Sequence, residues 1–282
     1  APRTIWIPMW DSVRRKPRMF WQRIPKGVRI IAFAEAVAQQ SRAAGLDTLR
    51  LQYFSNPDAL PPADWSRERV AFYWNRTGLA GPEFLRRWCA ALRIDRLLFK
   101  PELDPFINRK ACYTLPDRLG KTRVEIIPHT EHREDFFRLI EPANIFLAPR
   151  NSEGIGLTFI EALARGCAVF AFNAPTMNEY IQHGQTGYLF SSRTPLAMRA
   201  MNRLQNGLAR RGFRLGVLPH FHYLNTNQPW DEVAEIDVEA LGRRAREAHL
   251  QGYAEWQRSL PAYAAFLADG PTSDPVPYLE AI

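Results

Sequence analysis

Two periodicities alternate along the middle of this 282-residue chain. Short runs of almost continuous apolar residues, such as 168–172, are separated by segments whose apolar residues recur at helical spacing. Continuous apolar strands are typical of parallel sheets that are buried on both faces, and the helices between them supply the crossovers. The pattern therefore predicts an α/β fold with a doubly wound parallel sheet. The predicted strands are 70–73, 96–99, 124–127, 145–148, 168–172 and 188–190, and the predicted helices are about 82–93, 105–118, 134–141, 156–165 and 177–182.

The segments on either side have a different character. Residues 1–65 contain three strand candidates (4–8, 28–33 and 48–53) and a helical pattern over 34–44 that Gly45 closes, which predicts a parallel crossover unit. Residues 193–282 are mostly helical in pattern, with one helix starting near Pro195 and another over about 236–268. We therefore divide the chain into residues 1–65, 66–192 and 193–282.

The chain is basic, with a formal net charge of +8. The densest cluster of cations is the stretch 14–18, which has Trp10, Phe20 and Trp21 close by. Such a stretch is either a solvated loop or a surface that an anionic membrane attracts. No nucleic-acid-binding motif accompanies it, so we expect no nucleic acid partner. No apolar run is long enough for a transmembrane helix.

The cysteines and histidines argue against a disulfide framework and against a metal site. The three cysteines, Cys89, Cys112 and Cys167, are far apart in sequence. The histidine pairs at 129/132 and 220/222 have no cysteine or carboxylate set beside them. A reducing, cytoplasmic compartment without a bound metal is the expectation.

The segment from Ala148 to Gly166 has the character of an anion site. A strand ends there, a loop with Gly154 and Gly156 follows, and a helix begins near Gly156. A helix N-terminus carries unpaired N–H groups and a partial positive charge, and glycines let a ligand approach the backbone. A diphosphate suits such a site, and the Thr158 hydroxyl offers one more hydrogen bond.

Two glutamates flank this helix start. Glu153 lies in the loop and Glu161 lies about one turn into the helix. A carboxylate beside a phosphate site needs a reason because like charges repel. Accepting hydrogen bonds from hydroxyl groups is one reason, with a ribose at Glu161 and a sugar ring at Glu153. Spacing alone equally allows an ordinary exposed helix residue and a favourable charge near a helix start.

This stretch resembles the motif of retaining GT-B glycosyltransferases, in particular those of family 4. In that family a strand ends in Pro-Ser, and Glu-Gly, a Gly-Leu helix start, Glu-Ala and a Gly before the next strand follow. The matching residues are Pro149, Glu153, Gly154, Gly156, Leu157, Glu161, Ala162, Gly166 and Val169, continuing through 178–181 to Gly184, Gly187 and Leu189.

The resemblance implies a GT-B fold in which residues 66–192 form the Rossmann-like donor-binding domain. Residues 1–65 would be the C-terminal part of a truncated acceptor domain, and 193–282 a helical extension that packs on both. The implied reaction moves a sugar from a nucleoside diphosphate sugar to an acceptor hydroxyl with retention, in surface polysaccharide or glycan synthesis. A glycan or lipid-linked acceptor would place the protein in the cytoplasm with a peripheral contact at the inner membrane face.

The resemblance also assigns roles to residues. Glu153 would contact the donor sugar and shape the transition state, and Glu161 would bind the ribose hydroxyls. The backbone from Gly154 through Gly156, Leu157 and Thr158 would hold the diphosphate. The resemblance further implies that no cofactor or metal is needed, because the helix start and an arginine neutralise the diphosphate.

Two further positions follow from the same comparison. Arg76, preceded by Asn75 in the donor site, stands where the family has the arginine that neutralises the diphosphate, and the loop with His129 would contact the base. The family's lysine a few residues later is missing, since 77–84 contains none. Arg86, Arg87 or Lys100 could replace it.

Two alternatives stay open at this point. One is a non-catalytic nucleotide-sugar-binding module of a larger glycosyltransferase assembly, which the missing lysine and the short first segment motivate. The other is an epimerase on the same scaffold, for which His129 is the candidate acid or base. A dinucleotide-dependent dehydrogenase is not expected, because no Gly-x-Gly-x-x-Gly follows an early strand with an acidic residue beyond it.

Overall fold

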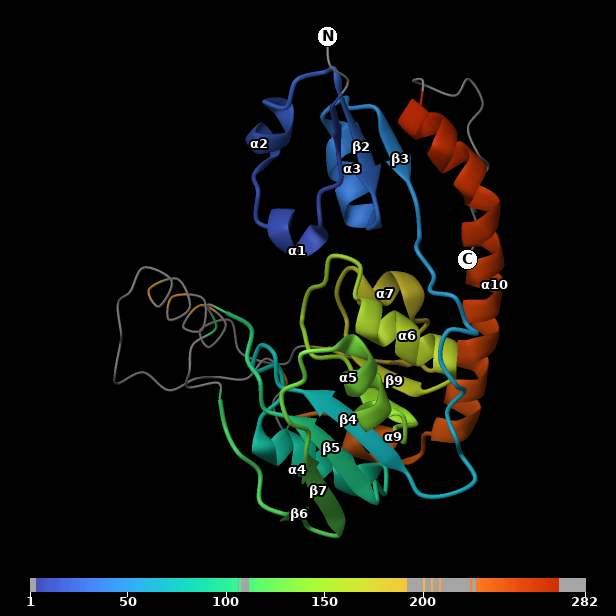
Figure 1. Cartoon of the computed structure of the whole chain (residues 1–282). Coiled ribbons are helices and arrows are strands. Elements are labelled where there is room, and N and C mark those ends of the chain that lie inside the picture. The colour runs from blue at the N-terminus through green and yellow to red at the C-terminus, as the bar shows by residue number, and fades with distance from the viewer. Residues whose placement is uncertain are drawn as a thin grey trace.

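The computed structural model describes residues 4–105, 107, 112–191, 200, 204, 208, 224 and 227–268. Figure 1 shows two parallel sheets, one above the other, with the long helix α10 (Val238–Ala268) running alongside both. We call them the small sheet and the large sheet. The helices and strands alternate along the chain, so the predicted α/β class is confirmed.

The large sheet has seven strands in the order β10-β9-β8-β4-β5-β7-β6. All neighbours are parallel except β6 and β7 at one edge. The strands are β4 (Val70–Trp74), β5 (Arg96–Lys100), β6 (Arg118–Leu119), β7 (Thr122–Ile126), β8 (Ile145–Leu147), β9 (Ala168–Phe172) and β10 (Tyr188–Phe190).

This order has one topological switch point. From β4 the chain moves outward to β5 and β7, then crosses back to β8 on the other side of β4 and continues outward. Ligands of doubly wound sheets bind where the order reverses, outside the carboxyl ends of the strands. The β4–β8 boundary is therefore where the fold favours a site.

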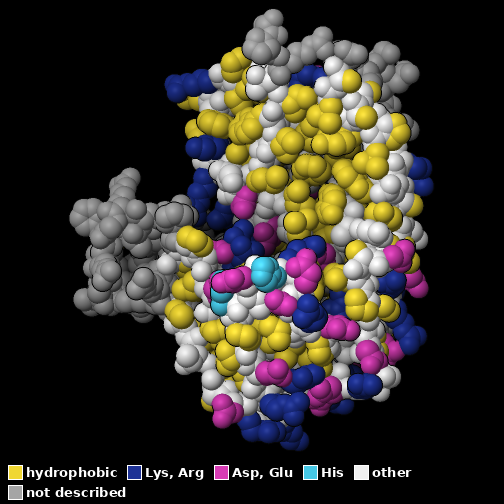
Figure 2. Space-filling view, viewed as in Figure 1, with side chains coloured by type: hydrophobic (Ala, Val, Ile, Leu, Met, Phe, Trp, Pro, Cys, Tyr) yellow, Lys and Arg dark blue, Asp and Glu magenta, His cyan; other side chains and the backbone are white. Residues whose placement is uncertain are grey.

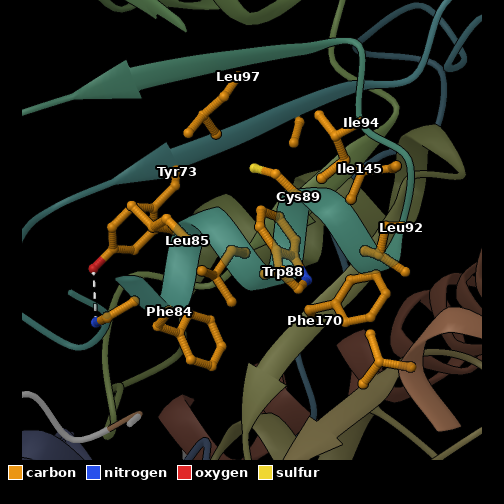
Figure 3. Packing of buried hydrophobic residues seen from close by; sticks show 14 of the residues in the cluster. Tyr73, Phe84, Leu85, Trp88, Cys89, Leu92, Ile94, Leu97, Ile145 and Phe170 are labelled. Carbon is orange, nitrogen blue, oxygen red and sulfur yellow. Dashed lines mark hydrogen bonds between the residues drawn. The ribbon is translucent and has the colours of Figure 1, made fainter. Parts of the chain in front are cut away.

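Helices cover both faces of the large sheet. Strand side chains alternate between two buried clusters, so that β4 gives Ala71 and Tyr73 to one face and Val70 and Phe72 to the other. Figure 3 shows the first cluster, in which Trp88 of α4 packs against Phe170. The covering helices are α4 (Pro82–Ala91) and α9 (Trp230–Ala234) on one face, and α5 (Arg133–Ile140), α6 (Leu157–Arg165) and α7 (Met177–Tyr180) on the other.

The small sheet has three parallel strands in the order β1-β2-β3. They are β1 (Thr4–Trp6), β2 (Val28–Ala32) and β3 (Thr48–Arg50), with helices α1 (Trp10–Val13), α2 (Arg18–Gln22) and α3 (Glu35–Ala43). Trp21 is fully buried among Ile30, Val37 and their neighbours on the helical face. On the opposite face Ile31 and Leu51 pack against Phe266 of α10.

Helix α10 connects the two sheets. At 1.5 Å per residue its 31 residues span about 46 Å. Its Leu241 and Ala245 are buried in the clusters of the large sheet, and Phe266 is buried against the small one. Among the described residues, no helix is both long and apolar enough to cross a membrane.

Most predicted elements of the large sheet match the structure to within about two residues, but one helix is wrong. Part of the helix predicted over 105–118 lies outside the described residues, and 112–117 is irregular before β6 begins. Most of the helix predicted near Pro195, and the histidines at 220 and 222, also lie outside the described residues. The three-part division at 65 and 192 stays a prediction.

Candidate active site

A cavity of about 460 Å³ lies at the β4–β8 switch point, between the large sheet and the loop that follows β1. Figure 2 shows charged side chains and histidines gathered at this level of the molecule, where the two sheets meet. Residues from both parts of the chain surround the cavity. Its lining is Met9, Asp11, Trp74, Arg76, Arg133, Phe136, Phe137, Glu153, Gly154, Ile155, Gly156, Leu157, Thr158 and Glu161.

The start of α6 forms one wall, as the glycine pattern predicts. Gly156 caps the helix in the left-handed region, with φ of 82°. A Cβ there would lie 2.1 Å from Phe159 Cε1, so only glycine fits. Leu157 and Thr158 form the first turn and line the cavity. Their N–H groups belong to the set that an α-helix leaves without internal partners, which makes this wall an anion-binding surface.

Glu153 lies on the floor between that wall and two arginines. Its side chain is only 7% exposed, and Arg150 Nη1 is 3.5 Å from its Oε2. Burial raises the pKa of Glu153 to about 7, against the opposing effect of Arg150 and Arg76 and with the help of Asp11 and Asp104. Near neutral pH this carboxyl group therefore both donates and accepts hydrogen bonds, which suits a sugar hydroxyl.

Glu161 lies further along α6 and is also largely buried. Burial raises its pKa, and its ion pair with Arg133 opposes that shift. Arg133 begins α5 and its side chain is 68% exposed, so it covers Glu161 from the solvent side. A hydroxyl that binds Glu161 would share the carboxylate with Arg133.

Arg76 follows β4 and lines the cavity, as the motif comparison predicts. Its guanidinium stacks 4.7 Å from the ring centroid of Trp74, and its Nε donates to Asp104 Oδ1 at 2.8 Å. A second arginine, Arg150, follows β8 and binds the other oxygen of Asp104. Motif comparison assigned no role to Arg150 or Asp104. The signal that would have found Arg150 is its place directly after a predicted strand.

The small sheet contributes Met9 and Asp11 to the cavity. Both follow β1, and Met9 approaches so closely that a Cβ on Gly154 would lie 3.0 Å from the Met9 Cβ. Asp11 Oδ2 is 3.4 Å from Arg150 Nη1. The first part of the chain therefore completes the site.

Two predicted donor-binding residues lie elsewhere. Asn75 is fully buried, and its Oδ1 accepts from the backbone N–H of Gly78 at 3.1 Å, which shapes the turn after β4. His129 is 70% exposed and contacts Glu102 at 3.1 Å outside the cavity lining. The donor-binding roles of both residues stay predictions.

The replacements considered for the missing lysine do not line the cavity either. Arg86 and Arg87 bind Glu83 on the exposed face of α4. Lys100 is buried, with Glu102 Oε2 at 2.8 Å. Among the described residues, no group of three or more His, Cys, Asp or Glu is arranged to hold a metal ion.

Comparison with protein families adds independent information about the same segment. Residues 111–205 match the family model described as glycosyl transferases group 1. This range contains β8, the glycine loop and all of α6. The chain carries a glycosyl transferases group 1 domain. Comparison with curated protein sequences gives no match.

Solved structures share the fold of the glycosyl transferases group 1 domain and extend the similarity to most of the chain. Sucrose-phosphate synthase from Thermosynechococcus elongatus aligns with a TM-score of 0.57 at 16% identity, over 95% of this chain and 69% of that one. HepE from Anabaena, solved with UDP and glucose, aligns with a TM-score of 0.51 at 13% identity, over 93% and 71%. A glycosyltransferase from Rickettsia africae ESF-5 aligns with a TM-score of 0.51 at 14% identity, over 90% of this chain and 67% of that one. At these identities the likeness establishes the GT-B fold.

Proposed function

We propose that this chain is the donor-binding part of a retaining glycosyltransferase that uses a nucleoside diphosphate sugar. The observation that carries the proposal is the cavity at the β4–β8 switch point, which joins Arg76, Glu153, Glu161 and the start of α6. A cation and a helix N-terminus suit a diphosphate, and two buried carboxyl groups suit the hydroxyls on either side of it.

The reaction breaks the bond between the anomeric carbon and the phosphate oxygen, and the electron pair stays on the diphosphate. Arg76 and the first turn of α6 stabilise that charge as it develops. The acceptor oxygen bonds to the anomeric carbon, and its proton passes to a diphosphate oxygen. Glu153 orients the donor sugar, Glu161 binds the ribose, and no metal takes part. Retention is proposed from the resemblance to family 4.

Nucleotide binding tests this proposal directly. We expect one of UDP, GDP, dTDP and ADP to bind in calorimetry and to raise the melting temperature by mass action. Glu161→Ala should weaken it at least tenfold, because the ribose hydroxyls lose a buried acceptor. Glu134→Ala, which removes an exposed glutamate from neighbouring α5, is the control and should leave binding unchanged.

Two results would count against the assignment. If none of the four nucleotides binds at millimolar concentration, the chain has no donor site. If a nucleotide binds but the matching nucleotide sugars are neither transferred nor hydrolysed, the chain is the binding module of a larger assembly.

We also propose that the acceptor is a glycan or a lipid-linked glycan met at the cytoplasmic face of a membrane. The support is a basic surface formed by the connection between α1 and α2, by α2 and by the residue after it. No acidic residue occurs between Asp11 and Glu35, and no described acidic side chain pairs with Arg15, Lys16, Arg18 or Arg23. Met19, at 60% exposure, lies among these cations. An exposed apolar side chain within a cationic surface suits an anionic bilayer.

Vesicle sedimentation tests the membrane contact. The chain should sediment with vesicles of phosphatidylcholine and phosphatidylglycerol and stay in solution with phosphatidylcholine alone. The triple variant Arg15→Glu, Lys16→Glu, Arg18→Glu should lose at least tenfold in binding, because each cation near the surface contributes about 1 kcal/mol. The matched control reverses three exposed cations on the β6–β7 edge, Arg118, Lys121 and Arg123. Equal loss in both variants would mean that net charge alone drives the binding.

A further inference from the structure

Three neighbouring strands of the large sheet each deliver one charged side chain to the same point. Arg76 follows β4, Arg150 follows β8, and Asp104 follows β5. Tyr73 of β4 pairs with Leu147 of β8. Arg76 comes three residues after Tyr73, and Arg150 comes three residues after Leu147. The parallel register therefore brings two arginines together at the switch point although 74 positions separate them in sequence.

Asp104 holds the two arginines in place. Its Oδ1 accepts from Arg76 Nε at 2.8 Å, and its Oδ2 lies 2.8 Å from Arg150 Nε and 2.6 Å from Arg150 Nη2. The Asp104 and Arg150 side chains are only 16% and 20% exposed. Arg150 thus directs two donors, Nε and Nη2, at one oxygen of Asp104, and a guanidinium can direct the same two donors at phosphate oxygens.

Arg150 is surrounded by carboxyl groups. Besides Asp104 it contacts Asp11 at 3.4 Å and Glu153 at 3.5 Å, and both of these line the cavity. Two arginines thus face three carboxyl groups, so the positive charge is already neutralised before any ligand binds. A diphosphate therefore has to compete with Asp104 for the donors of both arginines.

We propose that Arg150 is the second cation that binds the donor diphosphate, and that Asp104 is the counterion that holds Arg76 and Arg150 in position until the diphosphate takes over those contacts. This inference rests on the proposed function. Arg150 contacts two residues that line the cavity, Asp11 and Glu153. Arg86 and Arg87 instead bind Glu83, and Lys100 binds Glu102, and neither of these glutamates lines the cavity.

The proposal predicts that substitutions at Arg150 and Asp104 change the binding of the phosphates and not that of the nucleoside. Arg150 and Asp104 should affect a nucleoside diphosphate strongly and the corresponding nucleoside not at all. The neutral variant Asp104→Asn keeps an oxygen that can accept from Arg76 and removes the competing charge. It should therefore bind the diphosphate more tightly, whereas a merely structural aspartate would only weaken the site when replaced.

The experiment is calorimetric titration with the nucleoside diphosphate that binds best among UDP, GDP, dTDP and ADP, and with its nucleoside. Arg150→Met should weaken the diphosphate at least tenfold and leave the nucleoside unchanged. Arg150→Lys keeps the positive charge but loses the paired donors of the guanidinium. Its affinity for the diphosphate should lie between those of the wild type and Arg150→Met. Asp104→Asn should tighten the diphosphate severalfold at low salt, and the gain should shrink as salt rises. Arg86→Met, at an exposed ion pair, is the control.

Each other outcome overturns the inference in a recognisable way. If Glu161→Ala abolishes nucleotide binding while Arg150→Met binds the diphosphate like the wild type, the proposed function stands and Arg150 has no part in it. If Asp104→Asn binds the diphosphate more weakly while its melting temperature is unchanged, Asp104 is not a competing counterion. If no nucleotide binds the wild type, both proposals fail together. A melting curve of each variant separates these cases from loss of the fold.

Discussion

The large and small sheets are built on the same parallel plan but bury their surfaces differently. Helices cover the large sheet on both faces, and its central strands are almost completely buried. The small sheet has α1, α2 and α3 on one face only. Its other face meets the end of α10, and Ile5, Phe33 and Leu49 stay partly exposed there beside Trp256 and Tyr263.

Figure 2 makes the difference visible. Hydrophobic side chains gather over the upper part of the molecule, where Figure 1 places β2, β3 and the end of α10, whereas charged side chains are scattered over the lower part. The large sheet therefore has a core on each face, while the small sheet has a core of its own on one face and depends on the end of α10 to cover the other. Since Met9 and Asp11 reach the cavity from the small sheet, that helix also supports the site.

Phe266→Ala should have the largest effect on the contact by which α10 stabilises the small sheet. Phe266 is buried against Ile31 and Leu51, and the Arg29 guanidinium lies 3.7 Å from its ring centroid. Removing a buried phenyl group costs about 3 kcal/mol or more. We expect hydrogen exchange to speed up across β1, β2 and β3 while β4 and β9 keep their protection.

Leu267→Ala is the matched control, because the adjacent Leu267 is 45% exposed. It should leave both sheets unchanged. If Phe266→Ala instead accelerates exchange equally in the two sheets, they unfold as one unit and the small sheet has no separate dependence on α10.

The same contrast explains which elements could be predicted from sequence. Strands β4 and β9 are continuous apolar runs because both their faces are buried, and they were located to within one residue. Helices α1 and α2 have four and five residues, too few to show a helical period, and they were not predicted. The wrong helix over 105–118 rested on a weak pattern in a segment that is irregular over 112–117.

The residues of the site also differ in whether the sequence alone could identify them. Glu153, Gly156 and Glu161 belong to one contiguous motif, and the structure brings all three to the cavity. Arg150 and Asp104 become important only through the pairing of β8 and β5 with β4, which no local pattern encodes. Asp11 depends on a contact between the two sheets. The functional roles of all these residues stay predictions until they are tested by binding.

A smaller effect should come from Glu153, which lies where the two sheets meet. Burial raises its pKa from 4.5 to about 7. The folded protein therefore binds a proton that the unfolded chain releases, so stability is fully present below about pH 4.5 and is lost as the pH rises through 7. At 1.36 kcal/mol per unit the shift corresponds to a few kcal/mol, and we expect about 2 kcal/mol after partial relaxation.

Glu153→Gln should consequently be more stable than the wild type by about 2 kcal/mol at pH 8 and equal to it near pH 4.5, measured by urea unfolding. Glutamine keeps the shape and an oxygen for Arg150 without the buried charge.

Glu83→Gln is the comparison that tests the direction in which stability changes with pH. Glu83 is exposed, and hydrogen bonds from Arg86 and Arg87 lower its pKa to about 2. Its contribution is therefore present at pH 8 and lost in acid, opposite to that of Glu153, and solvent screening keeps it small. If Glu153→Gln also loses stability at pH 8, the pairing of Glu153 with Arg150 outweighs its burial. The junction of the two sheets would then be held together by the same charges that we assign to donor binding.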